Sequence, residues 1–483
     1  MKIGKCLTGV AMAALAFGSA AWAASPSSAS IPSIYDSSTA DPVYADGGTP
    51  TTLTPTMYLL DKTSFGKWLE SANISIGGFA EGGYYYDTNN PRYGSGPAGR
   101  PGNGDAPTLI AFPGDYSNRP LLDQVDLMIQ KTADTTKTFD FGFQAEQGYG
   151  IDDALIHSYG ILDNRAPASL YNKFQFGRTV ENYTDGEPDP NNQYDLVQGN
   201  VTLEVMGLQV KAGKFVTLIG NEVINPTGDL FYTHSYTFNF GEPLTQTGVL
   251  LSYTFPKVVL GHDLSITAGT TRGWNESTSD DNGEVDFLGE ASTSITDKLS
   301  VVFNMSEGPE GYQFFAGDKG DSHNYWTLLE VIPSYAVSDQ LTVSADCQYG
   351  DFPHGGLSTD ATGALISDGN AQWYSVCAYA DYKLCSYASI NTRIEWYRDQ
   401  GGFTGFLAGA DNAPISANYY EGTVGVQIHP FPTNDILQWL QLRPEVRYDW
   451  SDRAVFNASH DSSITGSGDY SQFSVAMDVI MQY

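Results

Sequence analysis

Hydrophobic and polar residues alternate with a period of two along most of the chain. In the segment 139–146, one parity carries Phe139, Phe141 and Phe143, and the other carries Asp140. Successive side chains of a β-strand point to opposite faces, so the alternation predicts strands with one apolar and one polar face. The chain is therefore predicted to be all-β. The last strand shows the same pattern, with Phe473, Val475, Met477, Val479, Met481 and Tyr483 on its apolar face.

The predicted strands form pairs, with a short polar turn at one end and a long connection rich in Gly, Asp, Asn and Pro at the other. Alternation of short turns and long loops is typical of a transmembrane antiparallel up-and-down β-barrel, whose short turns face the periplasm and whose long loops face outward. An even strand number places both termini in the periplasm. We expect about sixteen strands, near residues 74–86, 120–131, 138–149, 194–205, 208–216, 246–255, 263–274, 284–295, 299–306, 324–337, 341–350, 371–382, 386–399, 417–429, 437–450 and 470–483.

A soluble β-sandwich or propeller would also alternate, but aromatic residues near the predicted strand ends favour the membrane barrel. Tyr84, Tyr253, Trp396 and Trp450 lie on the apolar parity, as in the aromatic girdle of a membrane barrel. The chain also ends on the aromatic Tyr483. The six apolar residues of the last strand are therefore the predicted assembly signal, and the barrel assembly machinery is a predicted partner.

The N-terminus has the pattern of an export signal. Lys2 and Lys5 precede an apolar stretch at 7–17, and Ala21-Trp22-Ala23 fits a cleavage site. The alternative is a buried N-terminal helix. The predicted organisation is a signal peptide at 1–23, a flexible Ser/Pro/Thr-rich leader at 24–57, a short amphipathic helix at 58–72 and an outer-membrane β-barrel at 73–483.

Charge and composition exclude several classes of protein. The 24 basic residues stand against 56 acidic ones, a net charge of −32 that disfavours nucleic-acid binding. No long apolar run follows the N-terminus, which excludes a polytopic helical membrane protein. The seven histidines show no Ser/His/Asp setting, so an enzyme is not expected. No metal or cofactor motif is recognisable either.

The cysteines do not form a disulfide framework. Three remain after the predicted signal peptide, and an odd number is unlike the paired frameworks of secreted proteins. Cys377 and Cys385 lie on the same face and flank a short turn, which is compatible with one bridge. Packing as small residues within strands is the other interpretation.

Charged residues follow the polar parity of several strands. A charge on the lipid face costs about 2–4 kcal/mol near the middle of the membrane, so this parity should face the lumen. Opposed basic and acidic stripes would create a transverse field that sorts solutes by charge. The alternative is an ion-pair network that braces the wall, and both interpretations stay open. The predicted pore-lining residues are Glu81, Glu146, Arg393, Glu395, Glu421, Arg443, Glu445, Arg447 and Asp449.

The long connection 217–245 is unusually aromatic and apolar for a surface loop. A loop of this kind is predicted to fold into the lumen and narrow it. Its candidate constriction residues are Glu222, Asp229, His234 and Glu242. The alternative is an extracellular loop that packs on neighbouring loops.

Three segments resemble a known family. They are GKFVTLIGNEV with YTHSYTFNFGEPLTQTGVLLSY, TRIEWYRDQGGFTG, and LRPEVRYDWSD. They are similar to the putative β-barrel porin-2, OmpL-like family of bacterial outer-membrane proteins, and the resemblance extends from about residue 58 to the end. It implies a porin-type barrel, but it names neither a substrate nor catalytic residues.

The sequence as a whole predicts an outer-membrane porin for passive diffusion of ions and small hydrophilic solutes in a Gram-negative bacterium. Outer-membrane lipid and lipopolysaccharide are the expected surroundings. The oligomeric state is open, with a homotrimer among the candidates. The alternative function is a sealed barrel that acts as an anchor, adhesin or receptor through its loops.

Overall fold

The structure is a computed structural model. It describes residues 53–88, 120–158, 160, 193–278, 283–309, 325–353, 357–359, 365–367, 369–401, 416–453, 456–457 and 468–483. The predicted signal peptide and nearly all of the predicted leader lie outside these residues. No helix of the described part is long and apolar enough to span a membrane.

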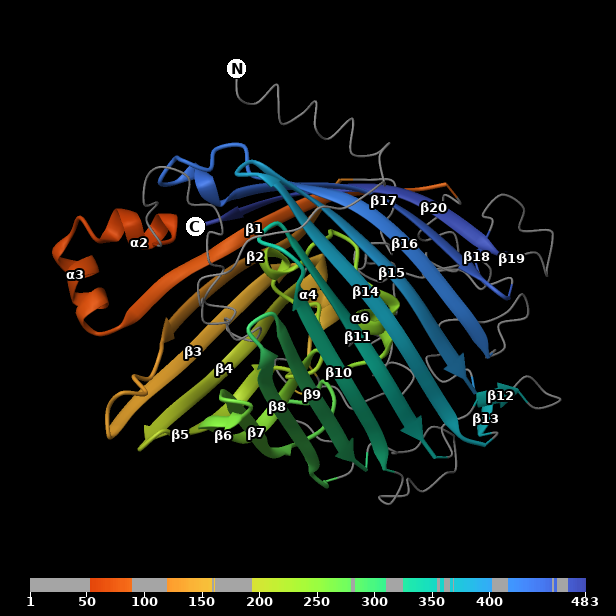
Figure 1. Ribbon diagram of the computed structural model, residues 1–483, viewed down its shortest axis with the longest axis horizontal. Coiled ribbons are helices and arrows are strands. Elements are labelled where there is room, and N and C mark those ends of the chain that lie inside the picture. The colour runs from red at the N-terminus through yellow and green to blue at the C-terminus, as the bar shows by residue number, and fades with distance from the viewer. Residues whose placement is uncertain are drawn as a thin grey trace, which may run out of the picture.

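The described strands close into one antiparallel barrel, as the alternation predicts (Figure 1). The last strand pairs with the first, for example at Met477 and Tyr84, and this contact closes the sheet. The sixteen barrel strands are β1 (Ile74–Asp87), β2 (Pro120–Lys131), β3 (Phe139–Gly150), β4 (Gln193–Val205), β5 (Leu208–Val216), β6 (Thr245–Val259), β7 (His262–Thr271), β8 (Asp286–Thr296), β9 (Leu299–Gly308), β10 (Trp326–Ala336), β11 (Leu341–Phe352), β14 (Ala371–Cys385), β15 (Ala388–Gln400), β16 (Ala417–Ile428), β17 (Leu440–Ser451) and β20 (Ser471–Gln482).

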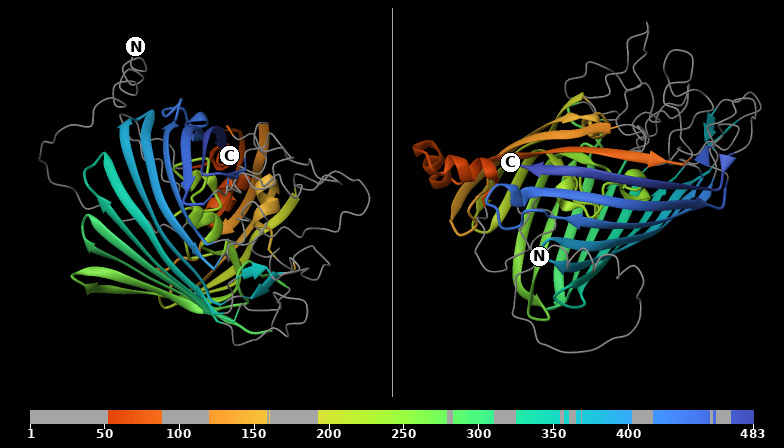
Figure 2. Two further views of the ribbon diagram at one scale, coloured as in Figure 1. Left: turned by 90° about the vertical axis from the view of Figure 1, so that its right-hand side faces the viewer. Right: turned by 90° about the horizontal axis from the view of Figure 1, so that it is seen from above.

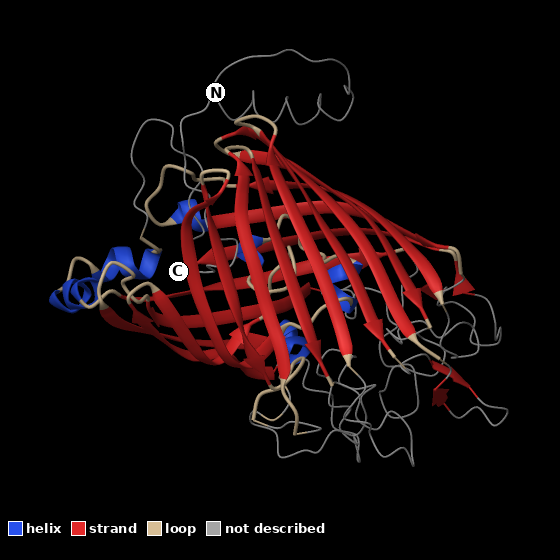
Figure 3. Cartoon of the chain, turned by 60° about the horizontal axis from the view of Figure 1, so that its bottom comes forward, coloured by secondary structure: helices blue, strands red, loops and turns tan. Residues whose placement is uncertain are grey.

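The connections carry short elements of their own. Two small hairpins lie in long connections, β12 (Leu357–Thr359) with β13 (Leu365–Ser367) and β18 (Phe456–Asn457) with β19 (Gly468–Asp469). The helical elements are α2 (Pro55–Leu60), α3 (Ser64–Ser71), α4 (Ile151–Ile156), η2 (Pro226–Gly228), α6 (Tyr236–Phe240) and η3 (Leu437–Trp439). Figure 3 shows α2 and α3 beside the barrel, at one end, and helical turns enclosed by its strands.

The helix expected at 58–72 is instead two short helices, α2 and α3. The break lies at 61–63, where the Thr63 side chain accepts a hydrogen bond from the Gly66 amide and caps α3. Gly66 also packs closely on Leu60, since a Cβ atom on residue 66 would lie 1.9 Å from the Leu60 carbonyl oxygen. This close approach fixes the corner between the helices.

Exposure alternates along the strands with the expected parity. In β17, Val446 and Tyr448 are 44% and 47% exposed on the outer face, whereas Arg447 and Asp449 are buried on the inner face. The outward residues are apolar or aromatic, which suits contact with lipid. The charged parity therefore faces the barrel interior.

Cys377 is a free cysteine and is completely buried. The bridge to Cys385 that the sequence allowed is therefore wrong. Cys377 lies on the inner face of β14, where it is opposite Asp346 of β11 and Glu395 of β15. A small side chain fits there among larger polar neighbours.

Arginine in place of Ile394 should destabilise the folded barrel by about 2–4 kcal/mol, the cost of a lipid-facing charge near the membrane centre. Ile394 is 65% exposed and lies at the middle of β15. The matched control is Val337→Arg, because Val337 is exposed in the turn after β10, where the expected cost is about 0–1 kcal/mol. Urea unfolding in lipid vesicles measures both values. Equal costs would contradict the assigned membrane position.

Candidate functional site

The connection between β5 and β6, residues 217–244, fills part of the barrel interior, and we call it the lumen loop. It carries η2 and α6, and the ribbon views show α6 enclosed by the strands (Figures 1 and 2). The four candidate constriction residues all belong to this buried segment. Their exposed fractions are 7% for Glu222, 4% for Asp229, 8% for His234 and 7% for Glu242. The lumen loop therefore packs on the inner wall of the barrel.

Three wall arginines donate hydrogen bonds to backbone carbonyls of the lumen loop. Arg393 Nη1 lies 2.7 Å from Thr233 O, and Arg447 Nη1 lies 2.6 Å from His234 O. Arg443 Nη1 contacts two carbonyls, Pro226 O at 2.8 Å and Asp229 O at 3.0 Å. An enclosed carbonyl needs a donor to replace water, and the arginines supply it.

Wall carboxylates satisfy the amides of the same loop. Glu395 accepts hydrogen bonds from the Tyr236 and Thr237 amides, both at 2.6 Å. Glu445 accepts one from the Tyr232 amide at 2.8 Å and is also bonded by Thr233. The wall arginines thus donate hydrogen bonds to carbonyls of an irregular loop, and the wall glutamates accept hydrogen bonds from its amides.

The arginines are also tied to acidic side chains. Arg393 bridges Glu222 of the lumen loop and Glu421 of β16, at 2.7 and 2.6 Å. Arg447 contacts Asp449 at 2.8 Å and Glu421 at 3.5 Å. Arg443 pairs with Asp478 of β20 and, at 3.0 Å, with Glu81 of β1.

The three arginines are shielded from water, with exposed fractions of 1% for Arg393, 2% for Arg443 and 1% for Arg447. Their inward orientation agrees with the strand parity. They form part of a buried ion-pair network beneath the lumen loop. Of the predicted pore-lining set, Glu146 lies apart, on β3, where Gln198 donates to it.

Electrostatics differ among the loop residues. Burial raises the pKa of Glu222, but the Arg393 guanidinium and His234 outweigh it and hold the pKa below its ordinary value. Burial lowers the pKa of His234, so the neutral imidazole is favoured. Burial and the nearby Glu222 carboxylate raise the pKa of Asp229. Glu222 is thus the charged partner of Arg393.

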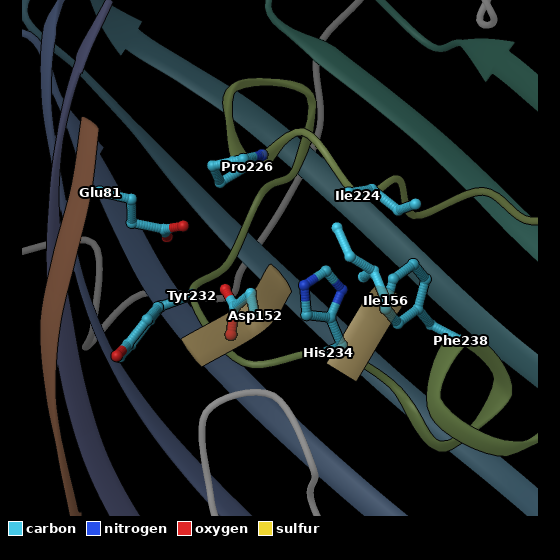
Figure 4. Close-up of a pocket in the computed structure, with 8 residues that line it drawn as sticks. All are labelled: Glu81, Asp152, Ile156, Ile224, Pro226, Tyr232, His234 and Phe238. Carbon is cyan, nitrogen blue, oxygen red and sulfur yellow. The ribbon is translucent and has the colours of Figure 1, made fainter. Parts of the chain in front are cut away.

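A small cavity lies between the lumen loop, β1 and α4. Figure 4 shows Asp152, His234 and Phe238 around it, with Glu81 on the wall. Asp152 and Ile156 come from α4, a helix that the sequence did not predict. The cavity lining mixes carboxylates with apolar side chains.

Aromatic and aliphatic side chains fill another part of the interior, near the long connections. Trp326 and Phe352, at the outer ends of β10 and β11, pack with ring centroids 4.6 Å apart. Tyr236 of α6 packs on Tyr419 with ring centroids 5.5 Å apart, and both belong to the same cluster of buried residues. This aromatic core consists of Phe215, Ile219, Tyr236, Leu250, Trp274, Leu288, Trp326, Leu328, Phe352, Ala371, Trp373, Tyr397, Ala417, Tyr419 and Phe456.

Toward the short turns, the inner faces of β6–β8, β10 and β11 carry hydroxyl groups that sequence reasoning missed. Ser252 and Thr267 lie on the inner parity of β6 and β7 and are hydrogen bonded at 2.8 Å, and both are half-buried. The signal was present in segments such as Leu264-Ser265-Ile266-Thr267, where Ser and Thr alternate with apolar residues. This hydroxyl wall comprises Ser252, Thr254, Ser265, Thr267, Ser292, Ser294, Ser334 and Ser344.

A closed sixteen-strand antiparallel barrel with an apolar outer face and a polar interior crossed by a loop defines a porin-type outer-membrane protein. The chain belongs to the putative β-barrel porin-2, OmpL-like family, whose sequence model matches residues 73–483. The family resemblance that the sequence suggested is thus confirmed. The family and the fold together imply location in the bacterial outer membrane.

Several solved structures of outer-membrane channels are similar to the chain. The anion-selective porin from Comamonas acidovorans has a TM-score of 0.48 and 13% identity, over 85% of this chain and 99% of that chain. The outer-membrane channel DcaP of Acinetobacter baumannii has a TM-score of 0.45 and 11% identity, over 85% and 97%. OmpF of Salmonella typhi has a TM-score of 0.45 and 13% identity, over 86% of this chain and 99% of that chain. No curated protein matches the sequence.

Proposed function

We propose that the protein is a channel for passive diffusion of ions and small hydrophilic solutes across the outer membrane. The observation that carries the proposal is the hydroxyl wall of β6–β8, β10 and β11, which is half-exposed inside a closed barrel. Serine and threonine hydroxyls replace water for a passing polar solute without binding it tightly. The lumen loop narrows the path, and Glu222, Asp229, His234 and Glu242 set its position.

The predicted pore-lining residues take a different part in this proposal. Arg393, Arg443 and Arg447 act through the loop that they hold, because their guanidinium groups are buried beneath it. The hydroxyl wall supplies the surface that touches solute. Selectivity thus comes from the loop position and from charges near the openings.

Single-channel recording in a planar bilayer tests this function. The purified barrel should give stepwise increases in conductance, and its vesicles should swell in small sugars. A heat-unfolded sample of the same preparation is the control for detergent leakage. Absence of steps at every voltage would contradict the channel.

A sealed barrel that serves as an anchor, adhesin or receptor is the second candidate. The aromatic core favours it, because fifteen buried residues fill the interior beside the outer ends of the strands. The same recording separates the two candidates. A silent but folded barrel would support the sealed form.

Modest preference for cations at low salt is expected of the channel. With the signal peptide removed, 22 basic residues face 56 acidic ones, a net charge of −34. Charges near an opening concentrate counter-ions within a Debye length, about 10 Å at 0.1 M salt. The preference should fade at 1 M salt. Reversal potentials measured across salt gradients check this, and an anion preference at low salt would contradict it.

Deletion of Tyr483 should lower the amount of folded protein in the outer membrane. We propose that Phe473, Val475, Met477, Val479, Met481 and Tyr483 form the signal read by the barrel assembly machinery. Tyr483 also contacts β1 and β2, since it exchanges backbone hydrogen bonds with Gly78 and its hydroxyl donates to Asp126 O. Tyr483→Phe keeps an aromatic terminus and is the control. Equal outer-membrane levels for the deletion and the control would contradict the signal.

Export by a signal peptide at 1–23, contact with lipopolysaccharide, and assembly as a homotrimer belong to the same proposal. Mass determination of the native complex in mild detergent tests the trimer. N-terminal sequencing of the mature protein tests cleavage after Ala23.

A further inference from the structure

Three carboxylates from the lumen loop and the wall meet in the barrel interior. They belong to Glu242, which follows α6, Glu330 of β10 and Asp346 of β11, and one oxygen of each lies within 4.8 Å of the others. Their exposed fractions are 7%, 1% and 2%. We call this group the carboxylate triad.

The triad has no cationic partner in the described part of the chain. None of its members forms an ion pair there, in contrast to Glu222 and Glu421, which both contact Arg393. Its hydrogen-bond donors are neutral. Glu330 accepts from the Gly220 amide at 3.0 Å and Asn304 at 2.6 Å, and Asp346 accepts from the Asn221 amide at 3.1 Å. Neutral donors alone compensate poorly for several buried negative charges.

Two buried oxygen atoms at the triad have no hydrogen-bond partner. One is Asp346 Oδ1. The other is Oε1 of Gln348, a side chain with an exposed fraction of 4%. The Gln348 amide nitrogen donates to Glu242 at 2.8 Å and to Glu330 at 2.7 Å, so the amide group lies at the triad. Carboxylate and amide oxygens are the ligands that hard divalent cations prefer.

We propose that the carboxylate triad binds one divalent cation of the Ca²⁺ class, and that the Gln348 amide turns over on binding so that its oxygen replaces the Nε2 donor beside the carboxylates. The oxygen-only donor set disfavours Zn²⁺ and copper, which take nitrogen and sulfur ligands. Irregular oxygen ligands from a loop and two strands suit Ca²⁺ better than Mg²⁺, which demands near-octahedral geometry. The cation neutralises the triad and ties the end of the lumen loop to β10 and β11.

The wall beside the triad carries a further carboxylate. Glu290 of β8 and Asn304 of β9 stand in one row with Glu330, and Glu290 is half-buried. The proposal does not depend on passage of solute through the barrel.

Calcium binding by the folded full-length barrel in lipopolysaccharide-free detergent tests the site. After treatment with chelator, the protein is titrated with CaCl₂ and, separately, with MgCl₂ by calorimetry. The titrations should show a saturable site that binds Ca²⁺ more tightly than Mg²⁺. Thermal unfolding followed by circular dichroism should shift upward by several degrees with Ca²⁺. Absence of saturable binding, or equal shifts with both ions, would overturn the proposal.

Variants assign the ion to the triad. Glu330→Gln with Asp346→Asn should abolish that saturable site and the shift, and in chelator it should unfold at or above the wild-type temperature because repulsion is relieved. Glu242→Gln tests the loop ligand alone if the double variant does not fold. Glu445→Gln is the matched control, a buried wall carboxylate that also bonds loop amides but lies outside the triad. Retention of the full calcium response in Glu330→Gln/Asp346→Asn would place the ion elsewhere and overturn the assignment.

Discussion

Replacement of Arg443 by Gln should lower the free energy of unfolding of the barrel by about 3–5 kcal/mol, the usual cost of removing one partner from a buried ion pair. Arg443 is 2% exposed and contacts Asp478 and Glu81. Its loss leaves two carboxylates buried without a cation. It also removes the donor from Pro226 O and Asp229 O of the lumen loop. Urea unfolding of the purified protein in vesicles, followed by tryptophan fluorescence, measures the loss.

Arg453→Gln is the matched control, since Arg453 is exposed beyond the end of β17 and its loss should cost less than about 1 kcal/mol. The reversal potential should be recorded for both variants. A stable Arg443→Gln barrel with altered ion selectivity would contradict the bracing role and would place the guanidinium in the path of ions. A large loss of stability in both variants would point to a general effect of charge.

The strand pattern was predictable because two solvents act on the two faces of each strand. Lipid outside and polar groups inside force strict alternation, so strands such as β17 and β20 are visible in the sequence. The parity of Arg443 and Arg447 followed from the same rule. Parity states which face a side chain occupies, but it does not state whether that face meets water or another segment.

Tertiary contacts explain what the sequence did not predict. Arg393 is buried because Glu222 and Thr233, more than 150 residues earlier, pack on it. No local sequence pattern predicts such a contact. The break between α2 and α3 and the position of α4 also depend on packing. The hydroxyl wall, in contrast, has a local signal, because Ser and Thr alternate with apolar residues in its strands.

Charged side chains of the wall form hydrogen bonds with backbone groups of the lumen loop. A loop without regular secondary structure leaves N–H and C=O groups unpaired, and an enclosed lumen offers little water to satisfy them. Glu395 and Glu445 accept hydrogen bonds from the loop amides. The loop carbonyls accept hydrogen bonds from Arg393, Arg443 and Arg447. Charged wall residues therefore set the loop position. This coupling predicts that the loop and not the wall charge controls the width of the path.

Removal of the lumen loop should widen the channel and raise its single-channel conductance several-fold. Val216 and Thr245 are paired neighbours at the ends of β5 and β6, so a short Gly/Ser turn can replace residues 218–243 without strain on the barrel. The wall arginines and carboxylates then meet water, which solvates them in place of the loop. Bilayer recording of the shortened protein measures the increase.

The control shortens the connection between β15 and β16, whose flanking residues Asp399 and Ala417 are also paired, and should leave the conductance near that of the wild type. It shows whether shortening any connection has the same effect. Newly exposed wall charges should also alter the reversal potential of the loop-shortened protein, because carboxylates and guanidinium groups then stand beside the ion path. An unchanged conductance in a folded, loop-shortened barrel would mean that the loop does not narrow the path. Silence of that barrel would contradict the channel itself and favour the sealed form.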